Sequence, residues 1–106
     1  MLTIVCTQSI SIQSNVTVSW NTLIMDTDFH ATRDTLTGKV NDYVAPITIG
    51  EGCWICTRSV ILKGAVIPDG CIVGANAVVT KRFEECNTLI AGNPAKCTKQ
   101  NITMIK

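Results

Sequence analysis

The stretch Ile49–Glu84 divides into six groups of six residues, IGEGCW ICTRSV ILKGAV IPDGCI VGANAV VTKRFE. The first position of every group is Ile or Val, and the fifth is Cys, Ser or Ala in all groups but the last. The same frame continues upstream in four groups that begin at Cys6, Ile12, Val18 and Ile24. A fixed period of this kind indicates a repeat architecture and excludes a Greek-key sandwich or a TIM barrel.

Each group of six predicts a short strand followed by a tight corner. The fourth position holds Gly or Asn, which tolerate a left-handed backbone, at Asn15, Asn21, Gly52, Gly64, Gly70 and Asn76. The fifth, sixth and next first residues form the strand, with the fifth and first turned inward and the sixth outward. Three corners close a triangular coil of about 18 residues, and coils stack as parallel strands about 4.8 Å apart. We therefore predict an all-β fold, a parallel β-helix of about three coils.

One segment does not fit the period of six. Residues 28–46 form an excursion loop that holds the only histidine of the chain, His30. Long loops on rigid scaffolds commonly carry function. Together with a C-terminal tail at residues 85–106, this loop belongs to what we predict is a single β-helix domain of 106 residues.

Composition excludes several classes of function. The net charge is +1 and only 16% of residues are charged, so no basic stripe predicts nucleic-acid binding. The longest apolar runs are far shorter than the roughly 20 residues that span a bilayer, so no membrane association is expected. Residues 1–6 lack the charged and apolar regions of a signal peptide, and we expect a cytoplasmic protein.

The chain has six cysteines. Nothing in the sequence indicates secretion, so a disulfide framework is not expected. Cys53 and Cys56 form a CxxC, but without a second CxxC or a histidine at ligand spacing we expect no zinc site. Cys53 and Cys71 are 18 residues apart at inward positions, so they are predicted to stack in the core as reduced thiols.

The outward sixth positions are apolar at Trp54, Val60, Val66, Ile72 and Val78. The spacing of one coil stacks Trp54 on Ile72 and Val60 on Val78. Exposed apolar strips commonly mark an interface or a ligand groove. A prism of three coils is also small for independent stability, so an oligomer is predicted.

Three stretches of the chain resemble the hexapeptide-repeat acyltransferase family, and within it the galactoside and maltose O-acetyltransferase branch. They are Ile24–His30 (IMDTDFH), Pro46–Ile55 (PITIGEGCWI), and Val73–Lys81 (VGANAVVTK) followed by Ala91–Lys96 (AGNPAK). The resemblance implies that the β-helix is left-handed. It also implies a homotrimer with C3 symmetry and active sites between subunits.

The resemblance further implies transfer of an acetyl group from acetyl-CoA, as co-substrate, to a hydroxyl, or less often an amine, of a small acceptor such as a sugar. A sugar hydroxyl must lose its proton as it attacks the thioester, and a positioned base accelerates such a step by roughly 10²–10⁴-fold. His30 falls where the catalytic histidine of the family falls, so it is the predicted general base. Asp26 or Asp28 is expected to orient its ring.

Trp54 has two interpretations. By resemblance it lines the acceptor and acetyl site near His30 of a partner subunit, and otherwise it is an aromatic residue of the trimer interface. The CoA contacts implied by the resemblance are Thr57, Ala75, Thr80, Lys81, Lys96 and Lys99. Of these, Lys96 and Lys99 match basic residues that meet the CoA phosphates. Ordinary solvated lysines are the alternative.

A second class of function stays open. Relatives carry an N-terminal helical segment and further coils before the region that matches Cys6, and an acceptor-binding Asn of those coils has no counterpart here. Cys56 stands where the family has Gly. The alternative is therefore a truncated, non-catalytic β-helical trimer that retains CoA binding. No metal is expected, because the γ-class carbonic anhydrases that share the fold need three histidines and this chain has one.

Overall fold

The computed structural model describes residues 1–105, which are built from short strands and turns. The strands are β1 (Thr3–Val5), β2 (Ile10–Ile12), β3 (Thr17–Val18), β4 (Leu23–Met25), β5 (Thr32–Arg33), β6 (Val40–Asn41), β7 (Ile47–Ile49), β8 (Trp54–Ile55), β9 (Val60–Ile61), β10 (Val66–Ile67), β11 (Ile72–Val73), β12 (Val78–Val79), β13 (Leu89–Gly92) and β14 (Ala95–Lys99). No helix long and apolar enough to cross a membrane occurs in this part of the chain.

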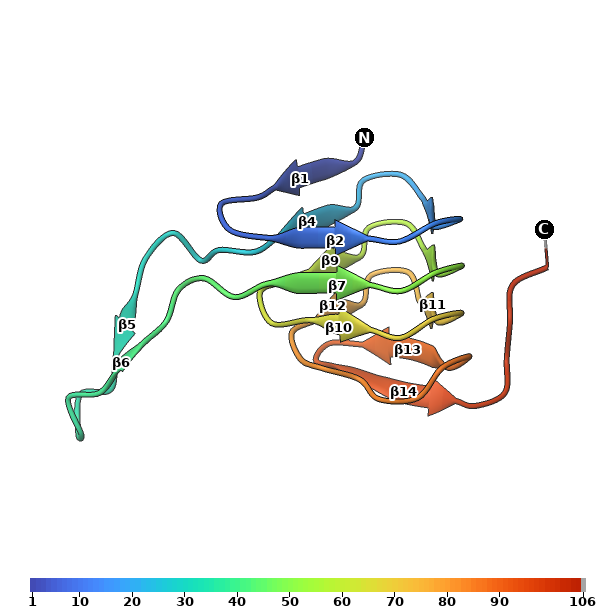
Figure 1. Ribbon diagram of the computed structural model, residues 1–106. Coiled ribbons are helices and arrows are strands. Elements are labelled where there is room, and N and C mark those ends of the chain that lie inside the picture. Colours follow the sequence, from blue (N-terminus) through green and yellow to red (C-terminus); the bar gives the residue numbers. More distant parts are fainter. Residues whose placement is uncertain (106) are drawn as a thin grey trace.

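Three sheets form the sides of a triangular prism (Figure 1). Their strand orders are β1-β4-β9-β12, β2-β7-β10 and β3-β8-β11-β13-β14. The chain visits the three sheets in turn, so that β1, β2 and β3 form the first coil, β4, β7 and β8 the second, and β9, β10 and β11 the third. The fourth coil begins with β12 and includes β13. Parallel registers such as Ile24 with Ile61 and Ile55 with Val73 place equivalent residues of successive coils side by side. The predicted parallel β-helix is confirmed.

The core is a column of first-position and fifth-position side chains. Ile55, Ile61, Ile67, Val73 and Val79 are buried together with Cys53, Ser59, Ala65, Cys71 and Ala77. The alternation of inward and outward residues is therefore as predicted. Cys53 and Cys71 are free thiols in this core. Burial raises the pKa of the Cys53 thiol to about 11.

The corners have the left-handed backbone that their residue types predict. Positive φ angles occur at Asn15, Asn21, Gly52, Gly64, Gly70 and Asn76. Arg58 is also a fourth-position residue, and its φ is 59°. A Cβ makes this conformation costly, so the repeat geometry prevails over the local preference of an arginine.

The outward stripes are in the predicted register. Trp54 pairs with Ile72, and Val60 pairs with Val78. Trp54, Val60 and Val78 are half-buried in the single chain, whereas Ile72 is only 7% exposed. Ile72 lies between Trp54 and Leu89 in its sheet.

The predicted frame is wrong at its first group. Ile4, and not Cys6, is in register with Ile24, and Cys6 is exposed. In the first coil the equivalent positions Ile4 and Ile12 are eight residues apart, whereas Ile61 and Ile67 in the third coil are six apart. The first corner, residues 6–9, therefore contains two additional residues.

The segment 85–106, predicted as a C-terminal tail, contains two strands of the third sheet in its described part. β13 continues the third sheet, with Ile90 in register with Val73, and β14 turns back along β13 as an antiparallel strand. Ile90 and Ala95 are buried. The period of six misses β13 because Ile90 follows Val79 by eleven residues.

Candidate functional site

The arm, defined here as residues 26–46, leaves the prism after β4 and returns at β7 (Figure 1). Its two limbs are hydrogen-bonded to each other at the base. Ala45 N–H donates to the Asp26 carbonyl at 3.1 Å, and Asp28 N–H donates to the Tyr43 carbonyl at 2.7 Å. Farther out, β5 and β6 pair as an antiparallel hairpin. The predicted excursion loop is thus an ordered arm.

His30 lies in a bulge of the outgoing limb. Between the pairs Thr27–Val44 and Thr32–Asn41, the outgoing limb has four residues and the returning limb has two. Unequal limbs of this kind force the longer one out of the regular ladder. His30 is exposed in this bulge.

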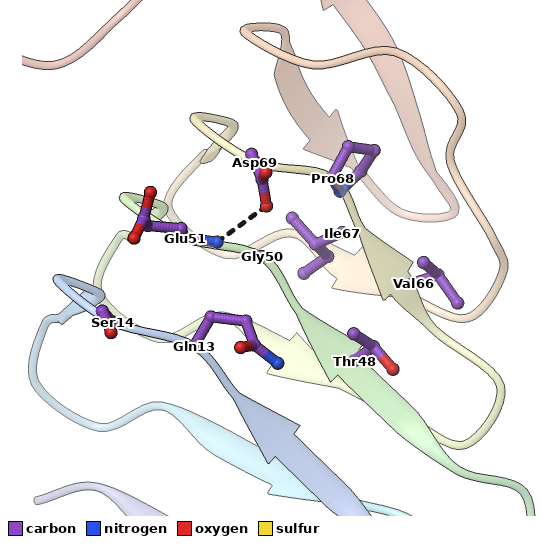
Figure 2. Close-up of a pocket in the computed structure, with 9 residues that line it drawn as sticks. All are labelled: Gln13, Ser14, Thr48, Gly50, Glu51, Val66, Ile67, Pro68 and Asp69. Atoms are coloured by element: carbon purple, nitrogen blue, oxygen red, sulfur yellow. Dashed lines mark hydrogen bonds between the residues drawn. The ribbon is translucent and has the colours of Figure 1, made fainter.

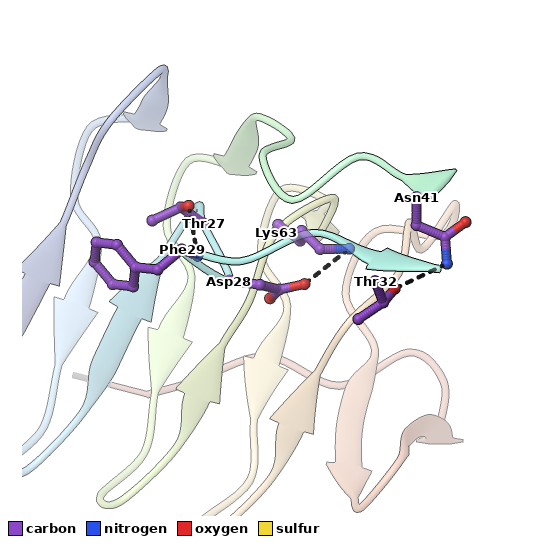
Figure 3. A network of polar contacts seen from close by, with 6 residues as sticks. All are labelled: Thr27, Asp28, Phe29, Thr32, Asn41 and Lys63. Carbon is purple, nitrogen blue, oxygen red and sulfur yellow. Dashed lines mark hydrogen bonds and ion pairs between the residues drawn. The ribbon is translucent and has the colours of Figure 1, made fainter. Parts of the chain in front are cut away.

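Phe29 forms the turn immediately before His30. Its φ of 64° lies in the left-handed region, which is rare for a bulky side chain. Phe29 N–H donates to Thr27 Oγ1 at 3.0 Å, so the Thr27 side chain closes the turn (Figure 3). Backbone strain of this kind persists only where the surroundings hold it, and it clusters at functional sites.

Asp26 lies at the root of the arm and is fully buried. Its carboxylate accepts hydrogen bonds from the N–H groups of Thr7, Gln8 and Ser9 at 2.9, 2.8 and 2.9 Å, and from the Thr7 hydroxyl at 3.1 Å. Burial acts to raise the pKa of Asp26, but these hydrogen bonds outweigh it and lower the pKa to about 2. The enlarged first corner thus binds this carboxylate through its backbone N–H groups. The prediction that Asp26 orients His30 is wrong.

Asp28 points to the following coil. Its carboxylate lies 3.4 Å from the Lys63 ammonium, and the two side chains are 46% and 30% exposed (Figure 3). Lys63 stands at the corner between β9 and β10. Asp28 therefore pairs with Lys63, in place of the predicted contact with the His30 ring.

Trp54 is far from the arm in the topology of the prism. It lies on β8, in the third sheet, and its half-buried side chain is at an outward position. The arm leaves from the corner between the first and second sheets, which lies on the opposite side of the prism (Figure 1). A single chain therefore does not bring His30 and Trp54 together.

The predicted CoA contacts form three groups. Thr57 and Ala75 occupy equivalent corner positions in successive coils, where Asn76 N–H donates to the Thr57 carbonyl at 3.1 Å. Thr80 and Lys81 are exposed at the end of β12. Lys96 and Lys99 are exposed on β14.

The first two groups flank one side of the prism. The Thr57 corner follows the third sheet, and the Thr80 corner follows the first sheet, so the outer face of β1-β4-β9-β12 lies between them. Leu23, Val60 and Val78 are in register along this face. This face therefore offers an extended ligand an apolar strip that has a polar corner on each side.

Two residues near these groups carried no functional prediction. Lys63 is one, because its partner Asp28 is distant in sequence. Trp20 is the other: it is 79% exposed, and the Thr57 hydroxyl donates to its carbonyl at 2.8 Å. Trp20 and Thr57 are both third-position residues of their groups of six, and they are one coil apart when the arm is left out of the count. This shared position is the sequence signal that indicates their proximity.

A shallow concavity of about 520 Å³ lies on the second sheet (Figure 2). It is lined by Gln13, Ser14, Thr48, Gly50, Glu51, Val66, Ile67, Pro68 and Asp69. Glu51 N–H donates to Asp69 Oδ1 at 2.9 Å, and a Cβ at Gly50 would collide with the same carboxylate. The lining contains none of the predicted site residues. This concavity therefore does not contribute to the predicted site.

No group of three or more His, Cys, Asp or Glu side chains in residues 1–105 is placed to hold a metal ion. The absence of a metal stays a prediction.

Comparisons with known proteins identify similar sequences. The bacterial transferase hexapeptide (six repeats) family matches residues 46–81. A galactoside O-acetyltransferase of Escherichia coli (strain K12) is 33% identical over 99 residues, which is 93% of this chain and 48% of that protein. The chain thus spans about half the length of this curated relative.

Solved structures agree with the fold. A galactoside acetyltransferase in complex with coenzyme A has a TM-score of 0.76 and 30% identity, and the match covers 93% of this chain and 48% of the other. The polysialic acid O-acetyltransferase OatWY has a TM-score of 0.79 and 28% identity over 99% of this chain and 62% of the other. The stacked parallel sheets are those of left-handed β-helix acetyltransferases, which confirms the predicted fold class.

Proposed function

We propose, from the premise that this chain belongs to the hexapeptide-repeat acetyltransferase family, that it transfers the acetyl group of acetyl-CoA to a hydroxyl of a sugar-type acceptor. The observation that carries this proposal is the placement of the only histidine, His30, in a strained turn on an ordered arm. Similarity to a galactoside acetyltransferase crystallised with coenzyme A supports the choice of acyl donor.

In the proposed reaction His30 is the general base. The imidazole accepts the hydroxyl proton as the acceptor oxygen attacks the acetyl carbonyl carbon. The thioester C–S bond then breaks, the acetyl group stays on the acceptor oxygen, and the CoA sulfur leaves with a proton returned by the imidazolium. No metal takes part in this proposal.

A homotrimer with active sites between subunits is part of the proposal. His30 is exposed in the single chain, and a base works best where water is excluded. Trp54 and Leu89, which are half-buried in the single chain, offer apolar surface on the other side of the prism. A neighbouring subunit that brings its Trp54 to His30 would complete the site.

The CoA contacts are proposed to be Thr57, Ala75, Thr80 and Lys81, with Lys96 and Lys99 near the phosphates. Thr57 and Ala75 act through close backbone approach, because the Thr57 hydroxyl is already donated to Trp20. The lysines are exposed and act as point charges. A cytoplasmic location stays a prediction.

The test is release of free thiol from acetyl-CoA with a panel of sugars, nucleotide sugars and amino acids. We expect acceptor-dependent release that falls by about 100-fold or more in His30→Ala, the loss typical of a removed general base. Lys39→Ala, an exposed residue of the same arm, is the matched control and should keep full activity. Binding of CoA without release in either protein would favour the alternative, a non-catalytic β-helical trimer.

A further inference from the structure

We propose that Asp28 and Lys63 are positioning residues for His30. Their ion pair ties the turn that carries the histidine to the corner of the third coil. The inference rests on the proposed function, since it assigns residues that act on its general base.

The segment Asp26-Thr27-Asp28 is held from two sides. The Asp26 carboxylate is bound by the corner of the first coil, and the Asp28 carboxylate pairs with Lys63 of the third coil. Thr27 closes the turn between them by accepting the N–H of Phe29. The arm therefore starts from a segment clamped between the coils before and after it.

Of the two carboxylates, that of Asp28 acts on the turn itself. Asp28 is two residues from His30 and directly precedes Phe29, whose left-handed backbone requires support. Figure 3 shows the Asp28 and Phe29 side chains directed to different sides of the turn, with Lys63 on the side of Asp28. The ion pair thus opposes relaxation of the strained turn.

An exposed pair of this kind adds little to the stability of the whole fold. A loop has its own local equilibrium, and a weak tether shifts that equilibrium directly. Because general-base catalysis needs near-attack geometry, loss of the tether lowers the fraction of molecules in which His30 is aligned. The effect is expected in kcat, and the KM for acetyl-CoA stays the same.

The first experiment compares wild type, Lys63→Met, Asp28→Asn and the double variant Asp28→Lys/Lys63→Asp, which exchanges the two charges and keeps their combined length. We expect kcat to fall about fivefold in the single variants, the largest effect an exposed ion pair usually supports. The KM for acetyl-CoA should stay constant, and the double variant should recover most of the loss. Glu84→Gln, which breaks the exposed Arg82–Glu84 pair away from the arm, is the matched control.

The second experiment needs no turnover. Because His30 is the only histidine, the Hε1 proton of its ring gives a single histidine signal in the NMR spectrum of the ligand-free protein. Lys63→Met should shift and broaden this signal, with recovery in the double variant and no change in Glu84→Gln. An unchanged signal in Lys63→Met overturns the tether even in an active enzyme. Absence of acetyl transfer in wild type overturns the proposed function and leaves the NMR result to decide the tether.

Discussion

His30 and Trp54 lie on opposite sides of the prism, on the arm between the first two sheets and on the outer face of the third. A site that needs both must take them from two subunits. Because His30 and Trp54 are separated within one chain, experiments on these two residues can distinguish an active site shared between subunits from one formed within a single subunit.

The first prediction concerns hybrid trimers. His30→Ala and Trp54→Ala, inactive alone, should regain activity when the two chains are refolded together, because some interfaces then combine an intact His30 with an intact Trp54. Random assembly gives about a quarter of such interfaces, so about a quarter of the wild-type rate is expected. Thiol release from acetyl-CoA measures it. As a control, refolding two batches of His30→Ala together should restore no activity. Equal rates in this control and in the mixture of His30→Ala with Trp54→Ala would contradict active sites shared between subunits.

The second prediction concerns acid stability. Since the pKa of Asp26 is lowered from 3.8 to about 2 in the folded state, folding favours its ionised form. The stabilisation is complete above the unfolded value near pH 4 and is lost as the pH falls through about 2. Urea unfolding should show that wild type has a larger free energy of unfolding than Asp26→Asn at pH 7. This difference between the two proteins should become smaller as the pH falls from about 4 to about 2. A difference in the free energy of unfolding that does not change with pH would contradict a stabilising role for the charge of Asp26.

The third prediction concerns the corner at Arg58. Arg58→Gly should raise the free energy of unfolding by about 0.5–1 kcal/mol, because the relief of left-handed strain exceeds the added entropy of the unfolded chain. Gly52→Ala is the reverse test: its φ is 71° and open space surrounds the new methyl group, so only strain is added. A loss of about 1 kcal/mol is expected there. Denaturation curves decide both, and a destabilised Arg58→Gly would be the unexpected result.

The fourth prediction concerns thiol reactivity. Cys6, Cys86 and Cys97 are exposed, whereas Cys53 and Cys71 are buried. Burial also raises the pKa of Cys53 to about 11, so its reactive thiolate is scarce at neutral pH. Brief alkylation followed by mass spectrometry should label the three exposed cysteines first, and unfolded protein should be labelled at all six. Early labelling of Cys53 would contradict the closed core.

The period of six predicted the inward and outward sides of the prism, and even the left-handed corners, because both follow from spacing and residue type. It failed at Cys6, where the first corner is longer than the others. The reason is that Thr7, Gln8 and Ser9 wrap around the Asp26 carboxylate. A partner that is seventeen or more residues away leaves no local signal.

The candidate site shows the same limit. His30 stood out because it is the only histidine and lies where the repeat is interrupted. The partners of Asp26 and Asp28 could not be predicted, because they depend on how the arm is seated between two coils. β13 was missed for a related reason, since an irregular corner separates Ile90 from Val79.

The arm is closed at its own base, where Ala45 N–H meets the Asp26 carbonyl and Thr27 is bridged to Val44. This closure and the Asp28–Lys63 ion pair fix the arm to the coils near its base. The β5–β6 hairpin lies farther out than Asp28 and His30, so replacing this hairpin would leave the proposed base and its ion-paired neighbour in place. We therefore expect an exchange of this hairpin alone to change the acceptor preference of the proposed enzyme, while the repeat that stacks the coils keeps its sequence.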